Sequence, residues 1–435
     1  MKHWAGKGSL AIVDQAFISG ANFVVSILLA RWTSSSEYGA FALAFAIFLL
    51  LSQLHQSLLL EPMSVFGGSY SGSRLKRYYG SLLHMQNGVF VAVAVPLALT
   101  AAVCSRFARG HELGAALWGV TLSAPFVLLF WMARRAFYLE HAPGRAAAGA
   151  ITYGVVTLVG LFLVRRNGHL TPFLAFAVMG AAALITSAAM FLHLRPRFSR
   201  EAQDLTLRLE CRQHWHYGRW ALAGALAMWI PQNVYYAVLT GADGMSAAAD
   251  IRALLNFAAP LQRITVALGF LLLPYMALCH SDRGRERAKA LTRVIVYLFL
   301  AGSLVYWALV LVFQKQLLHV LYDGKYSSIA HFLPWLAVSS ILNTGIAGLV
   351  VGLRAMRSPA SVFYAYGASA IVALVLGIPA TWIWGVAGVL FAFIVSNVAT
   401  LAVAAWMILQ PAAPMMMESA DPGLPLEALR QAKAS

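Results

Sequence analysis

Two neighbouring stretches decide the fold: GSLAIVDQAFISGANFVVSILLARW, residues 8–32, and YGAFALAFAIFLLLSQLHQSLLLEPM, residues 38–63. Each is apolar and long enough to cross a bilayer as a helix, which takes about 20 residues. Both also carry polar or ionisable side chains, namely Asp14, Gln15, Asn22, Gln53, His55, Gln56 and Glu61. Such groups are costly at membrane depth and usually face a bundle interior or a water-filled path. The two stretches therefore predict a membrane protein with a polar interior and favour a passage for a polar molecule.

The composition extends this prediction to the whole chain. Its 435 residues are 60% hydrophobic and 11% charged, with a mean hydropathy of +0.71, far from the pattern of soluble domains. We expect an all-α polytopic membrane protein with about twelve transmembrane helices. The apolar runs cover residues 10–32, 38–61, 80–104, 113–133, 146–164, 170–194, 219–240, 252–279, 294–314, 329–352, 361–379 and 383–409.

The formal charge of +16 indicates the topology. If the twelve predicted helices start with the N-terminus inside, most of the 32 basic residues fall on the side of the two termini. The positive-inside rule then places both termini in the cytoplasm. The basic excess is explained by this topology and by contact with membrane lipids, so we expect no nucleic-acid partner.

Polar segments divide the chain into four predicted parts. Residues 1–194 form an N-terminal six-helix lobe, 195–218 a cytoplasmic inter-lobe segment, 219–410 a C-terminal six-helix lobe and 411–435 a mobile cytoplasmic tail. The inter-lobe segment fits either a short helix on the inner membrane surface or a solvated connection.

Motifs of soluble enzymes and metal sites are missing from the sequence. It contains no HExxH, no P-loop, no GxSxG and no DxD. The cysteines Cys104, Cys211 and Cys279 lie far apart and lack metal-binding spacing. We therefore expect neither catalytic residues, a metal, a disulfide framework nor a bound cofactor.

Three helices carry the candidate substrate-binding residues. In the first, Gln15, Ser19, Asn22 and Ser26 share an arc of roughly 60°, and in the eighth, Arg252, Asn256 and Arg263 share roughly 40°. In the seventh, Trp229, Gln232 and Tyr236 share roughly 60°, and Asn233 follows them. Amides and an aromatic ring suit a sugar, whereas arginines suit an anion. Each stripe also fits ordinary contacts between helices.

Two acidic residues are candidates for ion coupling or gating. Asp14 lies at the flank of the first stripe, where it could pair with a cation on a neighbouring helix or bind a coupling ion. Glu61, followed by Pro62, is expected to end the second helix, as a member of a gating ion pair or as a solvated helix end.

Two longer strings resemble a known family. AIVDQAFISGANFVVSILLARWTSSSEYGAFALAFAIF, residues 11–48, with LEPMSV at 60–65, resembles the opening of Wzx-type polysaccharide flippases of the multidrug/oligosaccharidyl-lipid/polysaccharide (MOP) exporter superfamily. HVLYDGKYSSIAHFLPWLAVSSIL, residues 319–342, is similar to the Leu-Tyr-x-x-Lys-Tyr stretch of these proteins. The resemblance implies a MATE-like fold with two six-helix lobes around a central cavity.

The resemblance also implies a function. Such a protein would translocate an undecaprenyl-pyrophosphate-linked oligosaccharide across the bacterial inner membrane by alternating access, assisted by an H+ or Na+ gradient and working with polysaccharide polymerase machinery. One alternative is a multidrug efflux transporter of the same superfamily, which would call for an acidic, aromatic cavity. An alternative of another class is a membrane-embedded glycan polymerase or acyltransferase, which would need an acid/base pair that the sequence does not reveal.

Overall fold

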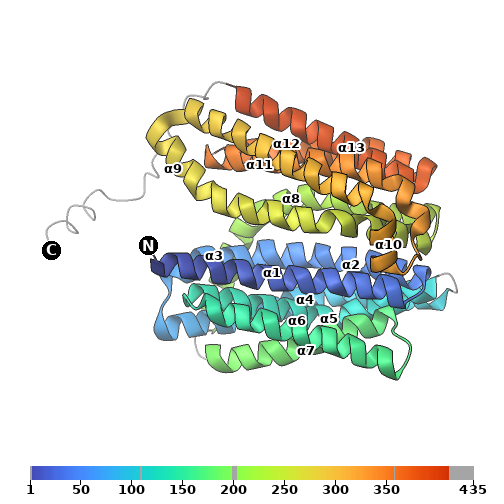
Figure 1. The fold of residues 1–435 in the computed structure, drawn as a ribbon. Coiled ribbons are helices and arrows are strands. Elements are labelled where there is room, and N and C mark those ends of the chain that lie inside the picture. Colours follow the sequence, from blue (N-terminus) through green and yellow to red (C-terminus); the bar gives the residue numbers. More distant parts are fainter. Residues whose placement is uncertain (1, 108–109, 198–202, 357, 411–435) are drawn as a thin grey trace.

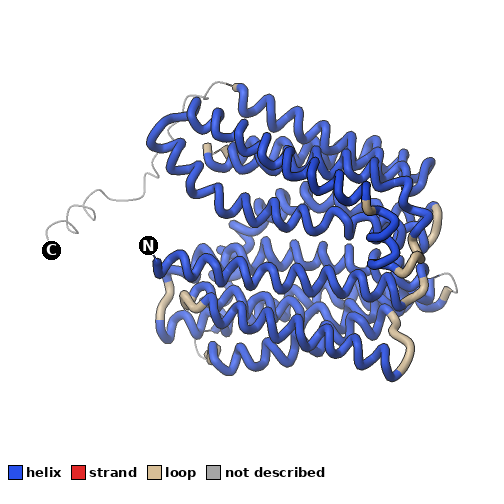
Figure 2. The backbone as a smooth tube through the Cα atoms, viewed as in Figure 1, coloured by secondary structure: helices blue, strands red, loops and turns tan. Residues whose placement is uncertain are grey.

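The computed structural model describes residues 2–107, 110–197, 203–356 and 358–410, so the predicted tail at 411–435 lies outside the described residues. The described chain is helical almost throughout and forms two helical lobes (Figures 1 and 2). Ten of its helical segments are long and apolar enough to span a membrane. One of these, Ala360–Leu409, reverses at a kink and provides two passes, and α8 also runs the length of the bundle. The prediction of a polytopic all-α membrane protein with about twelve helices is confirmed.

The N-terminal lobe is built from the first seven α-helices, which lie together in the lower half of Figure 1. They are α1 (Lys2–Trp32), α2 (Ser35–His55), α3 (Glu61–Phe66), α4 (Gly72–Arg106), α5 (His111–Leu139), α6 (Pro143–Asn167) and α7 (Pro172–Leu194). A π-helical turn, η1 (Gln56–Leu60), joins α2 to α3, and a short 3-10 turn, η2 (Gly67–Ser69), follows α3. The second apolar stretch of the sequence is therefore helical from Ser35 to Ser69, and it does not end at Glu61 as expected.

The C-terminal lobe contains the remaining helices, in the upper half of Figure 1. They are α8 (Gln203–Ala242), α9 (Met245–Val312), α10 (Gln314–Tyr322), η4 (Ser327–Phe332), α11 (Leu333–Ala355), α12 (Pro359–Val372), η5 (Ala373–Gly377) and α13 (Ile378–Leu409). Residues 203–218, expected in a separate inter-lobe segment, are the first part of α8 and continue into the predicted seventh span without interruption.

Glycines allow the chain to reverse direction within two continuous helical segments. Gly284 in α9 has φ +77° and Gly385 in α13 has φ +56°, a region that side-chain-bearing residues rarely occupy. Gly284 converts α9 into a helical hairpin, with its turn at the left of Figure 1. α9 thus contributes two passes to the lobe, and the segment from α12 through η5 to the end of α13 contributes two more.

Small residues allow close helix packing inside each lobe. In the N-terminal lobe, Gly180 of α7 faces Ser123 of α5, where a Cβ atom would lie 2.8 Å from the serine Cβ. In the C-terminal lobe, Gly348 and Gly352 of α11 face Val296 and Thr292 of α9. Such small-xxx-small contacts let helix backbones approach each other in membranes, where the hydrophobic effect does not drive helix association.

Candidate functional site

One contact between the lobes forms where α1 ends, α2 begins and α9 begins, and we call this end of the bundle the closed end (right of Figure 1). Gly39 of α2 lies so close to Met245 of α9 that a Cβ atom on residue 39 would overlap the Met245 carbonyl oxygen. A capping box fixes the start of α2, because Glu37 N–H donates to Ser34 Oγ at 3.1 Å and Ser34 N–H donates to Glu37 Oε2 at 2.8 Å. This cap sets where α2 meets α9.

Asn256 of α9 is the centre of the hydrogen bonds at the closed end. It is 4% exposed and accepts a hydrogen bond from Ser26 Oγ of α1 at 3.1 Å. Its amide nitrogen donates to the hydroxyls of Tyr38 at 3.0 Å and Tyr322 at 3.1 Å. The Tyr38 hydroxyl is also 2.8 Å from Ser26 Oγ. One buried amide from the C-terminal lobe thus joins two helices of the N-terminal lobe.

Arg252 lies one turn before Asn256 and also crosses between the lobes. Its Nε donates to Ser26 Oγ at 3.4 Å, and its guanidinium carbon lies 4.9 Å from the centre of the Phe45 ring of α2. The guanidinium group also interacts with the hydroxyls of Tyr38 and Tyr236. A cation is tolerated here because hydroxyls and an aromatic face surround it.

Lys325 adds a third contact, at the C-terminus of α1. Its Nζ donates to the Ala30 carbonyl oxygen at 3.1 Å and to the Thr33 carbonyl oxygen. These carbonyls belong to the last turn of a helix, where a cation is favoured by the helix dipole. Burial lowers the pKa of Lys325, and the nearby Glu37 carboxylate opposes the shift.

The other end of the bundle is the one where α1 begins, and we call it the N-terminal end. There α1 and the first half of α9 diverge (Figures 1 and 2), and the side chains of Gln15 on α1 and Arg263 on α9 are exposed. Gln15 Nε2 donates to Ser19 Oγ at 3.5 Å. Along the α1–α9 contact, the inter-lobe hydrogen bonds of the described residues all lie at the closed end.

The other predicted substrate-binding residues lie between the closed end and the N-terminal end of the bundle. Asn22 on α1 and Trp229 and Asn233 on α8 are half-buried, and Gln232 on α8 is exposed. Asn233 Nδ2 donates to the Trp229 carbonyl oxygen of its own helix at 3.1 Å. The Trp229 indole nitrogen is buried with no hydrogen-bond partner among the described residues. The structure thus brings Arg252 and Asn256 together, while the remaining candidates stay apart from that cluster.

Asp14 forms a buried ion pair within the N-terminal lobe. The carboxylate is 1% exposed and accepts hydrogen bonds from Arg134 Nε at 3.0 Å and Nη2 at 2.5 Å. The Tyr138 hydroxyl donates to the same carboxylate at 2.7 Å. Bidentate pairing of this kind compensates for the loss of water around both charges. Its assignment to ion coupling stays a prediction.

Glu61 lies near this pair, at the start of α3. It interacts with Gln56 one turn earlier and with Arg135 of α5, the neighbour of Arg134. Two acids from α1 and α3 therefore face two consecutive arginines of α5. Whether Glu61 acts in gating is likewise still a prediction.

The first part of α8 packs against the N-terminal lobe at the N-terminal end. His214 is 3% exposed, with Nδ1 3.0 Å from the Leu58 carbonyl oxygen and Nε2 2.7 Å from the Tyr78 hydroxyl. A carbonyl only accepts, so Nδ1 carries the proton and the tyrosine donates to Nε2 in the neutral ring. The Leu58 carbonyl oxygen can accept this bond because Pro62, four residues later in the helix, has no backbone N–H to donate to it. Burial lowers the pKa of His214, and the bond to the Leu58 carbonyl opposes the shift.

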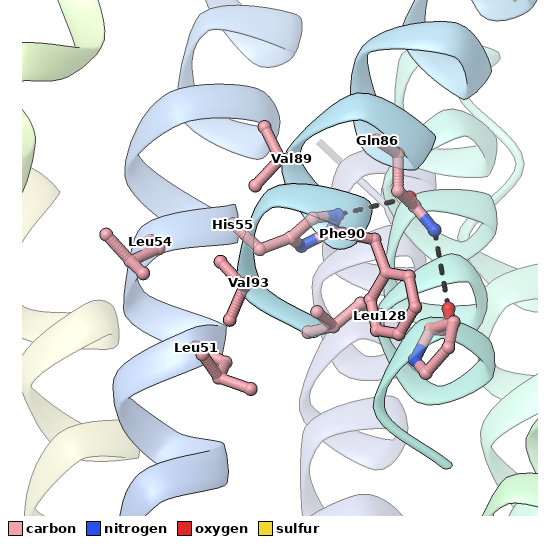
Figure 3. A pocket seen from close by; sticks show the side chains of 9 residues that line it. Leu51, Leu54, His55, Gln86, Val89, Phe90, Val93 and Leu128 are labelled. Atoms are coloured by element: carbon pink, nitrogen blue, oxygen red, sulfur yellow. Dashed lines mark hydrogen bonds between the residues drawn. The ribbon is translucent and has the colours of Figure 1, made fainter. Parts of the chain in front are cut away.

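A small apolar cavity lies beside His55 of α2, between α2, α4 and α5 (Figure 3). Its volume of about 20 Å³ is close to the space of one water molecule. His55 is 1% exposed and its Nε2 lies 3.2 Å from Gln86 Oε1, while Gln86 Nε2 donates to the Pro125 carbonyl oxygen at 3.4 Å. This chain of polar contacts connects three helices inside the lobe.

Several residues of the closed end were not singled out from the sequence. Tyr38, Tyr322, Lys325 and Tyr326 all lie in the strings that carry the family resemblance. In the structure these strings meet, because the Tyr38 and Tyr326 rings are 6.2 Å apart and the Tyr322 and Tyr326 rings 5.2 Å apart. The family resemblance of the two strings therefore included these residues, whereas the search for polar stripes on helices did not find them.

Comparison with known proteins gives the fold. No protein-family model matches the chain, and no curated protein matches it by sequence. The inward-facing conformation of a multidrug resistance MATE family transporter of the MOP superfamily aligns with a TM-score of 0.74 at 14% identity, covering 92% of this chain and 98% of that one. Lipid II flippase MurJ, in an inward closed conformation, aligns with a TM-score of 0.73 at 11% identity, covering 92% and 87%.

An outward-facing MATE family transporter of the MOP superfamily aligns less well, with a TM-score of 0.62 at 13% identity over 92% of this chain and 93% of that one. The chain therefore has the MATE-like fold of MOP superfamily transporters, as the resemblance implied.

Proposed function

We propose that this protein translocates an undecaprenyl-pyrophosphate-linked oligosaccharide across the bacterial inner membrane by alternating access, for surface polysaccharide biosynthesis. The observation that carries the proposal is the pair of arginines on one face of α9. Arg252 lies in the closed-end network, and Arg263 is exposed toward the N-terminal end. Arg263 suits the pyrophosphate, and Arg252, about 16 Å away along the same helix, suits an acidic sugar. Both cations oppose the binding of a cationic drug.

The remaining candidates have supporting roles in this proposal. Gln15, Asn22, Trp229, Gln232 and Asn233 would contact the glycan. The buried Asp14–Arg134 pair would couple to an H+ or Na+ gradient, because protonating Asp14 frees a buried arginine. The termini would lie in the cytoplasm, so the arrangement described here would be the one loaded from inside. The polymerase that consumes the repeat unit would act at the outer face.

The test is the substitution of Arg263 at matched expression. Arg263→Ala is expected to abolish most glycan export, whereas Arg263→Lys keeps the charge and should retain part of it. Arg287→Ala is the control, since Arg287 is an exposed arginine near the α9 turn. If both Arg263 variants export glycan normally, the assignment of the charge is wrong.

A second experiment separates the alternatives. Depletion of the protein should strand complete undecaprenyl-linked repeat units, which mass spectrometry detects and which an external glycosidase cannot reach in spheroplasts. Accessible or truncated units would instead indicate a glycan polymerase or acyltransferase. Unchanged glycans together with raised drug susceptibility would indicate multidrug efflux.

A further inference from the structure

A groove outside the inter-lobe site lies where the first part of α8 passes α3. We call it the α3–α8 groove, and its volume is about 380 Å³. Its lining residues are Phe66, Leu209, Arg212, Gln213, His216 and Tyr217. The floor is aromatic, with the Phe66 and Tyr217 rings 6.0 Å apart at 75°. The groove thus combines an apolar base with donors of hydrogen bonds.

Three faces of α8 explain how the groove is built. The buried face, including His214 and Gly218, packs on the N-terminal lobe, where a Cβ atom on residue 218 would lie 2.7 Å from the Ser57 carbonyl oxygen. A second face places Leu209, Gln213, His216 and Trp220 within an arc of roughly 60°. A third places Arg208, Arg212, Trp215 and Arg219 within another arc of roughly 60°. Arg212 lies at the boundary between the second and third faces.

Between Leu207 and Trp220, the exposed charged side chains of α8 are all arginines. Arg208, Arg212 and Arg219 are exposed, whereas the acidic Glu210 is half-buried and interacts with Arg74 of α4. The exposed surface therefore complements an anion.

Two tryptophans indicate that this surface meets the membrane boundary. Trp215 is 57% exposed and Trp220 is 71% exposed, and the Arg219 guanidinium carbon lies 5.5 Å from the Trp220 ring centre. Exposed tryptophans beside arginines are typical of the level of lipid headgroups. Beyond Trp220, α8 continues along the bundle.

We propose that the α3–α8 groove binds the headgroup of an anionic phospholipid. Arg212 would hold the phosphate through its planar pair of donors, and Gln213 and His216 would donate further hydrogen bonds. Phe66 and Tyr217 would pack against the glycerol and the first acyl carbons. This site is separate from the inter-lobe surface of Arg263 and does not depend on the transported molecule.

The experiment is native mass spectrometry of the purified full-length protein with added phosphatidylglycerol or phosphatidylcholine. The wild type should retain phosphatidylglycerol in preference to phosphatidylcholine. Arg212→Gln should weaken phosphatidylglycerol binding about five-fold, the size expected for one basic residue at the headgroup level. Arg208→Gln removes an exposed arginine that does not line the groove, and it should change binding less than about two-fold.

A second variant ensures that misfolding of Arg212→Gln is not mistaken for a loss of lipid binding. Gln213→Glu places a carboxylate in the groove without removing Arg212, and it should also weaken phosphatidylglycerol binding. Equal losses in the Arg208 and Arg212 variants would overturn the proposal in favour of diffuse attraction. Equal retention of the two phospholipids would overturn it, and so would displacement of phosphatidylglycerol by equimolar undecaprenyl pyrophosphate.

Discussion

Ser26 and Asn256 are 230 positions apart in the sequence, yet they form a 3.1 Å hydrogen bond between the two lobes. The bond is buried, and the Tyr38 and Tyr322 hydroxyls complete the coordination of the asparagine amide. Because a buried amide without partners is costly, this network favours the arrangement in which the closed end is shut. It is therefore a place where substitutions should shift the balance between conformations.

Asn256→Leu is expected to shift that balance toward the open state by about 2 kcal/mol, or about thirty-fold, since its two hydrogen bonds to the N-terminal lobe are lost. The measurement is thiol labelling of Ala30→Cys, a fully buried position at the closed end, after replacement of Cys104, Cys211 and Cys279. Asn397→Leu is the matched control, because its bonds to Ser339 stay inside the C-terminal lobe. Equal labelling of the two variants would contradict the role of Asn256.

Gly39→Ala should also weaken the closed end. The added Cβ atom would overlap the Met245 carbonyl oxygen, so α2 must move away from α9 at a cost of about 1–3 kcal/mol. Gly20→Ala on α1 is the control, as nothing lies within 4 Å of its Cβ position. The same labelling assay should report faster modification for Gly39→Ala alone, and similar rates for both variants would show that the contact does not hold the lobes together.

Asp14→Asn should lower the free energy of unfolding by about 3 kcal/mol, because it leaves Arg134 buried without its counter-ion. Combining it with Arg134→Gln should recover part of the loss, which a thermal double-mutant cycle measures. Arg31→Gln breaks an exposed pair with Asp323 and should cost less than about 1 kcal/mol. Additive effects of the two substitutions in the cycle would rule out a coupled pair.

His214 predicts a loss of stability in acid. Burial lowers its pKa below the ordinary value of 6.5, so the folded protein binds this proton less readily than the unfolded chain. The contribution to stability is complete above pH 6.5 and is lost as the pH falls below it. The melting temperature of the wild type should therefore drop between pH 7.5 and pH 5.5 by more than that of His214→Asn, which keeps a donor near Nδ1 without titrating. Parallel pH profiles would refute the assignment.

The architecture could be predicted because hydropathy and charge act locally. Twelve apolar runs of spanning length appear as helices. Gly284 separates the two passes of α9, and Gly385 separates the two passes of the segment Ala360–Leu409. The first part of α8 was harder, since its burial depends on a distant partner. His214 finds the Leu58 carbonyl 156 positions away, and a backbone acceptor leaves no mark in side-chain patterns.

The candidate site, too, could be predicted only where it depends on local sequence. The stripe of Arg252 and Asn256 was visible on a helical wheel, but a wheel does not distinguish a surface that meets substrate from one that meets the other lobe. Arg134 directly follows the predicted span at residues 113–133, yet α5 continues to Leu139 and directs this arginine to Asp14. Residue pairs that lie far apart in the chain need the packing of helices before they can be recognised.

The attachment of the first part of α8 to the N-terminal lobe makes any rocking of the lobes asymmetric. His214 and Gly218 attach α8 to η1, so under the proposed function the lobes would pivot about this contact between η1 and α8. A bulky lipid-linked cargo would then come and go along the opposite edge, between α1 and α9. An engineered disulfide between α3 and α8 should accordingly spare transport, whereas one between α1 and α9 should stop it.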